Sequence, residues 1–209
     1  AHGSSGRLTG PTVWEVSKRR FMPEGFETAW IQARDVNGWY SREELEFLWN
    51  SLENLNPLLD VLEIGCYYGR STSVIAEVCE RHSATLWIID PFHHRGVDVP
   101  EAQDSVMEIV ENSGVSCRLI ATKTLEVSPE SLADSFDAIH IDGSHEPQDV
   151  TIDCQLALPK LRSGGIVAFH DWADYMPGVA IGATEFVKNF GTVGQVGSLR
   201  IFLKEKNHA

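Results

Sequence analysis

The sequence predicts an α/β fold with a doubly wound, mostly parallel seven-stranded sheet, helices on both faces and an N-terminal cap. Two observations predict it. From residue 41 onward, short apolar runs alternate with segments of helical periodicity, which is the pattern of successive βαβ units. These runs are apolar at nearly every position rather than at alternate positions, which indicates strands that are buried on both faces beneath helices.

The expected elements follow the chain in order. Ser41, with Glu44 three positions later, forms a capping box, and leucines recur behind it at helical spacing, so a helix is expected to run from there to about residues 56–57. The remaining expectations are strands at 61–64, 85–89, 117–121, 138–141, 165–169, 193–196 and 199–203, and helices around 74–79, around 106–110, from 128–129, after Pro147 and at 179–190.

The chain divides into three parts. Residues 1–6 are interpreted as a remnant of cloning and are left out of the fold prediction. Residues 7–40 do not follow the alternation and are expected to cap the mouth of the site. Residues 41–209 are expected to form the main domain. The aromatic residues of the expected cap are Trp14, Phe21, Phe26, Trp30 and Trp39.

The composition disfavours several classes of partner. The chain has 209 residues, with 30 Asp plus Glu against 17 Lys plus Arg, and a formal net charge of −13. Nucleic acids and anionic membranes are bound by clustered basic side chains, so we expect neither as a partner. We expect no secretory leader, no spanning helix, and reduced cysteines, because the four cysteines are widely spaced. These features predict a cytoplasmic protein.

Acidic residues stand at or near the ends of four of the five apolar strands. They are Glu63, Asp90, Asp142 and Asp171. The carboxyl ends of parallel strands meet at one edge of an open sheet, and ligands bind in the crevice there. Half-buried carboxylates cost free energy unless they are paired with donors or a cation. The pattern therefore predicts a ligand site that four carboxylates share.

The glycine spacing disfavours a nicotinamide- or flavin-dependent oxidoreductase. A G-x-G-x-x-G fingerprint that begins at Gly65 requires glycine at the positions of Tyr67 and Arg70. The turn from Glu63 to Ser71 nevertheless lets the backbone approach a ligand closely and presents helix N–H groups to it. The loop is therefore expected to bind a cofactor of another class.

Together these motifs resemble class I S-adenosylmethionine-dependent methyltransferases. The broad resemblance rests on acid-x-Gly-x-x-x-Gly from Glu63 to Gly69, on Asp90, and on the glycines at 164–165. It covers residues 39–203 and implies a Rossmann-like methyltransferase domain. A narrower resemblance is to a small bacterial branch that includes macrolide-sugar O-methyltransferases. The residues that carry it are Ile141, Asp142, Gly143, Ser144, His145, Val150, Asp153, Gly164, Gly165, His170 and Asp171.

The resemblance implies where S-adenosylmethionine binds. Glu63 is expected to hold the methionine amino group, directly or through water. Asp90 is expected to bind the ribose, and Thr124 is expected to lie at the adenine edge. The other cofactor-binding residues are expected to be Gly65, Tyr67, Gly69 and Ser71, with the Ser71 hydroxyl at the carboxylate end.

The same resemblance implies the chemistry. A hydroxyl nucleophile must lose its proton, and His145 could be the base because its unperturbed pKa lies near neutrality. Asp142 and Asp171 could hold Mg²⁺ or another divalent cation that lowers the pKa of the acceptor oxygen. Alternate strand residues point to opposite faces, so Asp171 rather than His170 is expected to face the cation. The expected acceptor is a small molecule such as a sugar or another polyol.

Two alternatives from other classes stay open. Tyr67 stands where the family usually has its middle glycine, and Pro147 stands where the branch often has tyrosine. A non-catalytic S-adenosylmethionine or nucleoside binding protein would carry such changes, and it would bind the cofactor without turnover. An oxidoreductase would bind a nicotinamide cofactor instead.

Overall fold

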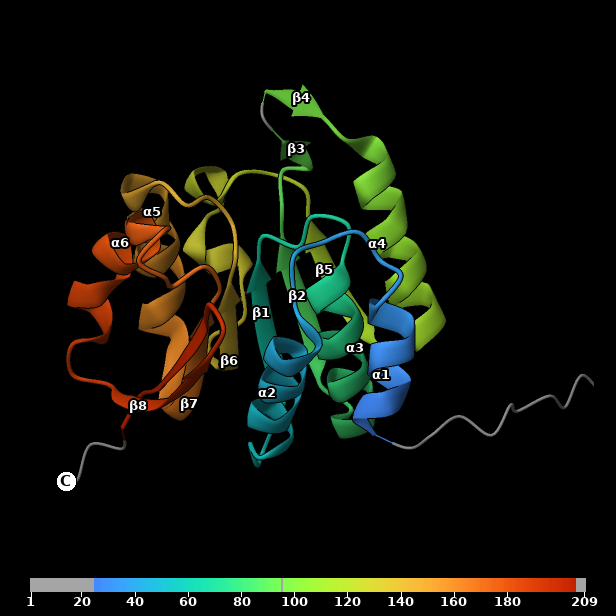
Figure 1. Ribbon diagram of the computed structural model, residues 1–209, viewed down its shortest axis with the longest axis horizontal. Coiled ribbons are helices and arrows are strands. Elements are labelled where there is room, and N and C mark those ends of the chain that lie inside the picture. Colours follow the sequence, from blue (N-terminus) through green and yellow to red (C-terminus); the bar gives the residue numbers. More distant parts are fainter. Residues whose placement is uncertain (1–24, 95, 206–209) are drawn as a thin grey trace, which may run out of the picture.

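The computed structural model describes residues 25–94 and 96–205. The predicted fold class is confirmed: a seven-stranded sheet has the strand order β5-β2-β1-β6-β7-β9-β8 (Figure 1). Strands β5, β2, β1, β6 and β7 are parallel, and β9 and β8 are antiparallel. The sheet strands are β1 Asp60–Ile64, β2 Thr85–Ile89, β5 Ser116–Ile120, β6 Phe136–Ile141, β7 Leu161–Phe169, β8 Gly191–Val196 and β9 Leu199–Leu203.

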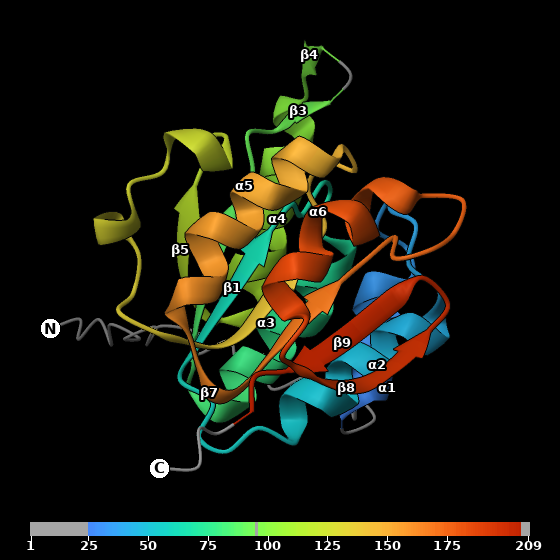
Figure 2. The same ribbon diagram turned by 90° about the vertical axis from the view of Figure 1, so that its left-hand side faces the viewer.

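Helices cover both faces of the sheet. Helices α1 to α4 lie on one face, and α5 and α6 lie on the other (Figures 1 and 2). Neighbouring strand residues enter different cores: Val61 packs beneath the first group of helices and Leu62 packs beneath the second. This explains why the central strands are apolar at most positions. The helices are α1 Phe26–Ala33, α2 Arg42–Glu53, α3 Arg70–His82, α4 Pro100–Ser113, α5 Pro147–Ala157 and α6 Pro177–Val187, with short 3₁₀ turns at Thr124–Glu126, Pro129–Ser131 and Leu158–Lys160.

Local sequence features account for the starts of helices α2 and α6 but not for their ends. The capping box is confirmed: the Glu44 N–H donates to Ser41 Oγ at 3.2 Å, and the Ser41 N–H donates to the Glu44 carboxylate at 2.8 Å. Helix α2 nevertheless ends at Glu53, before the expected boundary. Helix α6 starts at Pro177 because proline fits the first turn of a helix, and it ends at Val187 rather than at residue 190.

Two features of the fold were not predicted. Strands β3 His93–His94 and β4 Val97–Asp98 form a separate hairpin after β2, too short to leave a periodic pattern. Helix α1 was not expected either; it packs on α3 and lies in the segment that was expected to be a cap. Trp14, Phe21 and residues 1–6 lie outside the described residues. None of the described helices is long and apolar enough to cross a membrane.

Candidate active site

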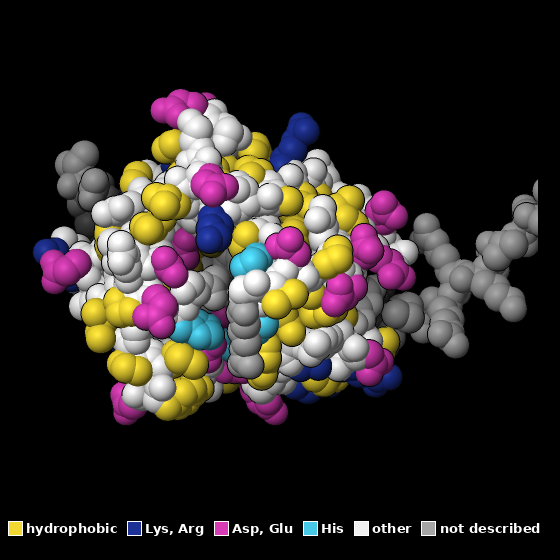
Figure 3. Space-filling model, turned by 90° about the horizontal axis from the view of Figure 1, so that it is seen from above, with side chains coloured by type: hydrophobic (Ala, Val, Ile, Leu, Met, Phe, Trp, Pro, Cys, Tyr) yellow, Lys and Arg dark blue, Asp and Glu magenta, His cyan; other side chains and the backbone are white. Residues whose placement is uncertain are grey.

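A cavity of about 590 Å³ opens at the carboxyl edge of the sheet. Its walls are the loops after β1, β2, β5, β6 and β7, the first half of α5, and residues 37–40. Figure 3 looks onto this edge, where histidine and acidic side chains gather near the centre of the face. The size is that of a site for a cofactor or small molecule.

Glu63 lies beneath the cavity rather than in its wall. Its side chain is 0% exposed, and it accepts hydrogen bonds from Ser71 Oγ at 2.6 Å and Thr72 Oγ1 at 2.7 Å. His140 Nδ1 lies 3.3 Å from the same carboxylate. This burial contradicts a direct contact between Glu63 and a ligand. Glu63 instead orders the first turn of α3, and Ser71 keeps a place in the cavity wall.

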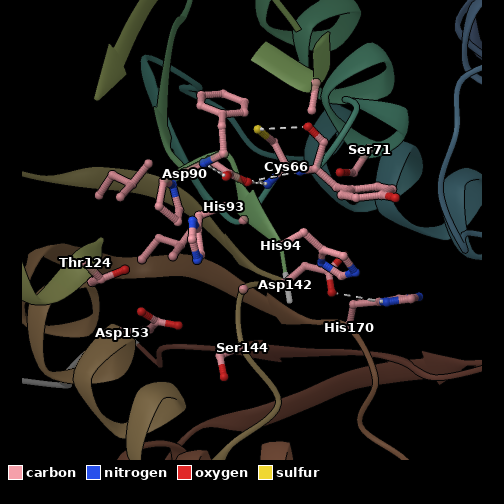
Figure 4. Close-up of a pocket in the computed structure, with 18 of the residues that line it drawn as sticks. Cys66, Ser71, Asp90, His93, His94, Thr124, Asp142, Ser144, Asp153 and His170 are labelled. Carbon is pink, nitrogen blue, oxygen red and sulfur yellow. Dashed lines mark hydrogen bonds and ion pairs between the residues drawn. The ribbon is translucent and has the colours of Figure 1, made fainter. Parts of the chain in front are cut away.

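Asp90 lines the cavity, but its carboxylate is already occupied by protein donors. Oδ2 accepts from the backbone N–H groups of Cys66 at 2.7 Å and Tyr67 at 3.0 Å. Oδ1 accepts from the Phe92 N–H at 2.6 Å. Figure 4 shows Asp90 against the Cys66 turn. Asp90 therefore ties the loop after β1, the β1 loop, to the end of β2, and its ribose contact stays a prediction.

The two loop glycines have different roles. Gly65 lines the cavity with a φ of +82°, and a Cβ atom there would lie 2.3 Å from the Asp142 carbonyl oxygen. Glycine is required because the loops after β1 and β6 touch. Gly69 faces away from the cavity, and a Cβ atom there would lie 2.7 Å from Ile109 Cδ1 of α4. Gly69 lets α3 approach α4 and is not among the residues that line the cavity, and its expected cofactor contact stays a prediction.

Aromatic side chains form one rim of the cavity. Tyr67, with a φ of +51°, stacks on Trp39 at 5.0 Å between ring centroids, and its ring lies 5.3 Å from that of His94. Trp39 is 67% exposed. These three residues come from three separate segments, so their proximity could not be predicted from sequence spacing.

Thr124 and Asp153 of α5 line the end of the cavity that is opposite Ser71 and His170 (Figure 4). Asp153 is 4% exposed, and burial raises its pKa to about 6, although a hydrogen bond from Thr124 opposes the shift. The site prediction missed Asp153. Its sequence signal was an acid on the apolar face of a helix, next to Val150 and Cys154.

Histidine and aspartate side chains meet at the ends of β6 and β7. His145 Nε2 lies 3.0 Å from Asp171 Oδ2, and His170 Nδ1 lies 3.3 Å from Asp142 Oδ1 and 3.4 Å from Asp171 Oδ2. One ligand atom each from Asp142, His170 and Asp171 falls within 4.8 Å of the others. The expectation that only Asp171 faces this point is wrong. Strand alternation has ended there, because Asp171 has a φ of +54°.

The proton positions on His170 follow from its partners. Ser198 Oγ donates to Glu44 Oε1 at 3.0 Å, so His170 Nε2 must donate to Ser198 Oγ at 3.2 Å. Nδ1 then faces Asp142 and Asp171. Burial lowers the pKa of His170, but hydrogen bonds to three surrounding carboxylates outweigh burial and raise it to about 12. Either a proton on Nδ1 or a metal cation in its place would neutralise charge on the carboxylates of Asp142 and Asp171.

The His145–Asp171 contact changes both groups. The hydrogen bond to Asp171 raises the pKa of His145, against a smaller opposing effect of burial. The same bond, with that to His170, lowers the pKa of Asp171. His145 is therefore a stronger base than a solvated histidine, and it remains partly exposed to the cavity.

Tyr40 is a buried member of the site that the sequence analysis missed. Its hydroxyl lies 2.5 Å from His140 Nε2, and its ring stacks on that of His170 at 3.9 Å. Burial raises the pKa of Tyr40, and the carboxylate of Asp142 adds to this. Tyr40 stands just before the cap of α2, in a segment that showed no periodic pattern.

Comparisons with known proteins agree with the fold. A family model described as a methyltransferase domain matches residues 62–172, just over half of the chain. No curated protein matches. Among solved structures, the O-methyltransferase NovP has a TM-score of 0.70 at 15% identity, over 79% of this chain and 81% of that chain.

Two other structures share the fold. The O-methyltransferase TomG from Streptomyces achromogenes, in complex with S-adenosylmethionine, has a TM-score of 0.61 at 18% identity, over 88% of this chain and 91% of its own. CalS11, a TDP-rhamnose 3′-O-methyltransferase, has a TM-score of 0.59 at 15% identity, over 77% of each chain. The chain therefore belongs to the methyltransferase-domain family and has the class I fold of S-adenosylmethionine-dependent methyltransferases.

Proposed function

We propose that this S-adenosylmethionine-dependent methyltransferase methylates a hydroxyl oxygen of a small molecule, such as a sugar or another polyol, with the help of a divalent cation. The observation that carries the proposal is the His145–Asp171 pair, which stands beside Asp142 in the cavity that the β1 loop also lines. A base and a candidate cation site thus share one cavity with the cofactor loop. The net charge of −13 supports a small-molecule acceptor over a nucleic acid.

The cavity fits the cofactor in size and in the chemistry of its walls. Thr124 and Asp153 lie at one end of it, Ser71 lies toward the other end, and Asp90 lies between them (Figure 4). The Thr124 hydroxyl and the Asp153 carboxylate suit a ligand that carries hydroxyl and amino groups, and the Ser71 oxygen can still accept a hydrogen bond although its proton is donated to Glu63. When bound, S-adenosylmethionine supplies an electrophilic methyl group on a sulfonium. The protein's own task is to align the acceptor with that group and to remove a proton.

His145 is the proposed proton acceptor. Its Nε2 must donate to Asp171, because a carboxylate only accepts, so Nδ1 carries the free lone pair. Nδ1 would take the proton of the acceptor hydroxyl as the oxygen attacks. The imidazolium that results is stabilised by Asp171, as in other histidine–carboxylate pairs.

The donor set at the ends of β6 and β7 fits a divalent cation. Asp142 and Asp171 would supply carboxylate oxygens, and His170 would supply Nδ1. The outward N–H of His170 is held by Ser198, as the second nitrogen of a metal-bound histidine usually is. Two carboxylates and one imidazole suit Mn²⁺ as well as Mg²⁺. The cation would polarise the acceptor oxygen and lower its pKa.

Calorimetric titration tests the cofactor first. S-adenosylmethionine and S-adenosylhomocysteine should bind in the micromolar range, and NADH, the negative control, should not bind. A nicotinamide that bound in their place would overturn the proposal. Titration with Mn²⁺ or Mg²⁺, and repetition in chelator, tests the cation. Activity that persists in chelator would exclude it.

An acceptor screen with the His145→Ala variant tests the base. Turnover should fall by about 10²-fold or more, while S-adenosylhomocysteine affinity is retained. His93→Ala is the matched control, because His93 lines the cavity but pairs with Asp98 of the hairpin at 2.8 Å. A wild-type rate in His145→Ala would exclude the role. Cofactor binding with no turnover on any acceptor would support the non-catalytic alternative.

The proposed location is the cytoplasm. All four cysteines, Cys66, Cys79, Cys117 and Cys154, are free thiols, and three of them are buried. This supports a reducing compartment.

A further inference from the structure

Arg70 reaches from the cofactor loop into the N-terminal segment. It is the first residue of α3, and its guanidinium lies against the strap, which we define as residues 34–40 between α1 and α2. The side chain donates to five backbone carbonyl oxygens: Nε to Val36 at 2.9 Å and Ala33 at 3.3 Å, Nη1 to Gly38 at 2.9 Å and Tyr40 at 3.2 Å, and Nη2 to Arg34 at 2.7 Å.

The strap is a wall of the cavity. Residues 37–40 line it, Trp39 stacks on Tyr67 of the β1 loop, and Tyr40 stacks on His170. The strap therefore touches both the cofactor loop and the candidate catalytic cluster. The position of the strap therefore determines where Trp39 lies in the rim and where the Tyr40 ring lies on His170.

The chemistry of Arg70 suits this contact. The carbonyls at the C-terminus of α1 have no partner within the helix, and a cation is favourable at that end. A guanidinium presents five N–H donors in a rigid plane, whereas lysine is a point charge with three rotating donors. Packing adds to the fit, because a Cβ atom on Gly38 would lie 2.9 Å from Arg70 Cβ. The strap backbone therefore rests directly on the Arg70 side chain.

We propose that Arg70 is a positioning residue that fixes the strap against the β1 loop, so that binding of an adenosyl ligand and ordering of the strap are coupled. The coupling rests on the proposed function, because it requires the β1 loop to bind that ligand. Ordering a wall before the ligand arrives lowers the entropic cost of binding. Arg70 joins the loop to the wall by hydrogen bonds, and the stack of Trp39 on Tyr67 is a second contact between them.

Hydrogen–deuterium exchange of the ligand-free protein tests the positioning role. In Arg70→Lys, amides of residues 34–40 should exchange about tenfold faster or more, while peptides from β1 and β6 keep wild-type rates. Gly38→Ala should have the same effect, since it displaces the strap without changing the charge. Arg81→Lys is the control, because Arg81 lies on the same helix and pairs with Glu53 at 2.8 Å. Wild-type exchange of the strap in Arg70→Lys, or equal acceleration everywhere, would overturn the role.

S-adenosylhomocysteine then tests the coupling. In the wild type it should slow exchange of the strap, and in Arg70→Lys its affinity should fall about tenfold, with the protection of the strap lost. Full protection and affinity in Arg70→Lys would overturn the coupling. If the wild type does not bind the ligand, the coupling fails together with the proposed cofactor, whereas the ligand-free exchange still decides whether Arg70 positions the strap.

Discussion

The acids on the two halves of the sheet edge have opposite environments. On the β1 and β2 side, Glu63 and Asp90 accept hydrogen bonds from two hydroxyls and three backbone N–H groups. On the β6 and β7 side, Asp142 and Asp171 share the imidazole of His170 and keep nearly a fifth of their surface exposed. Glu63 and Asp90 therefore stabilise the protein, whereas Asp142 and Asp171 face the cavity and keep negative charge that a cation could bind.

This difference shows that an acid at a strand end has no fixed meaning. A carboxylate whose lone pairs are filled by local donors stabilises a loop and has little left for a ligand. Two carboxylates that converge on one point raise the local negative potential and favour a proton or a metal cation there. The donors around each acid therefore separate the structural pair from the candidate functional pair.

The largest expected effect is the loss of Glu63. Glu63→Ala leaves two buried hydroxyls without their acceptor and removes the carboxylate that lies 3.3 Å from His140 Nδ1, so the free energy of unfolding should fall by about 3–5 kcal/mol. Urea denaturation measures it. Glu63→Gln keeps one acceptor oxygen and should lose less stability. Glu80→Ala, at an exposed position of α3, should change the free energy of unfolding by less than about 0.5 kcal/mol. If Glu63→Ala unfolds with the wild-type free energy, Glu63 does not stabilise the protein, and the contrast between the two pairs of acids is wrong.

In contrast to Glu63→Ala, Asp142→Asn should lower cation affinity strongly and change stability little. Cation affinity should fall about 10²-fold or more, because one anionic ligand is lost, while the free energy of unfolding changes by less than about 1 kcal/mol, because repulsion with Asp171 is also relieved. Titration with Mn²⁺ and denaturation of the same samples measure the two effects. Asp149→Asn, at a cavity residue outside the cluster, is the control. Equal cation affinity in all three proteins would reject the site.

Asp90→Asn sharpens the comparison, because Asp90 has both a structural and an expected cofactor role. The amide would turn an NH₂ group toward backbone N–H donors, so the free energy of unfolding should fall by about 2 kcal/mol and S-adenosylhomocysteine affinity should fall about tenfold. Asp98→Asn on the exposed hairpin is the control. Weaker binding at unchanged stability would show that Asp90 serves only the ribose.

Much of the fold could be predicted from the sequence, for a local reason. All seven sheet strands were expected. The central strands are recognisable because burial on both faces makes them apolar at most positions, whereas β8 is half-buried or exposed. The Ser41 capping box located the start of α2. The β3–β4 hairpin was not expected, because its strands have two residues each. The end of α2 was misplaced, because helix ends depend on packing as well as on sequence.

The candidate site could be predicted only in part. Topology alone brings the ends of parallel strands together, so the meeting of the four acids followed from the order of elements. The partners of each acid did not follow, since they are distant in sequence. Tyr40 meets His140 100 residues away, and Ser198 meets His170 28 residues away. The left-handed backbone of Asp171 likewise left no signal, and it turned His170 and Asp171 toward the same point.

The smallest expected effect concerns Asp153, a buried acid that belongs to neither pair. Burial raises its folded pKa to about 6, whereas the unfolded value is about 3.9. Between about pH 4 and about pH 6 the folded state keeps a proton that the unfolded state releases, so this group stabilises the protein below that window and loses the contribution as pH rises through it. Asp153→Asn cannot titrate. The difference in unfolding free energy between wild type and variant should therefore change by about 2 kcal/mol from pH 4 to pH 7, in the direction that disfavours the wild type at pH 7. Taking the difference cancels Glu44 and Asp171, whose pKa values are lowered and which act in the opposite direction. A pH-independent difference would mean that hydrogen bonds such as the one from Thr124 fully offset the burial of Asp153, which would then join Glu63 and Asp90 among the satisfied acids.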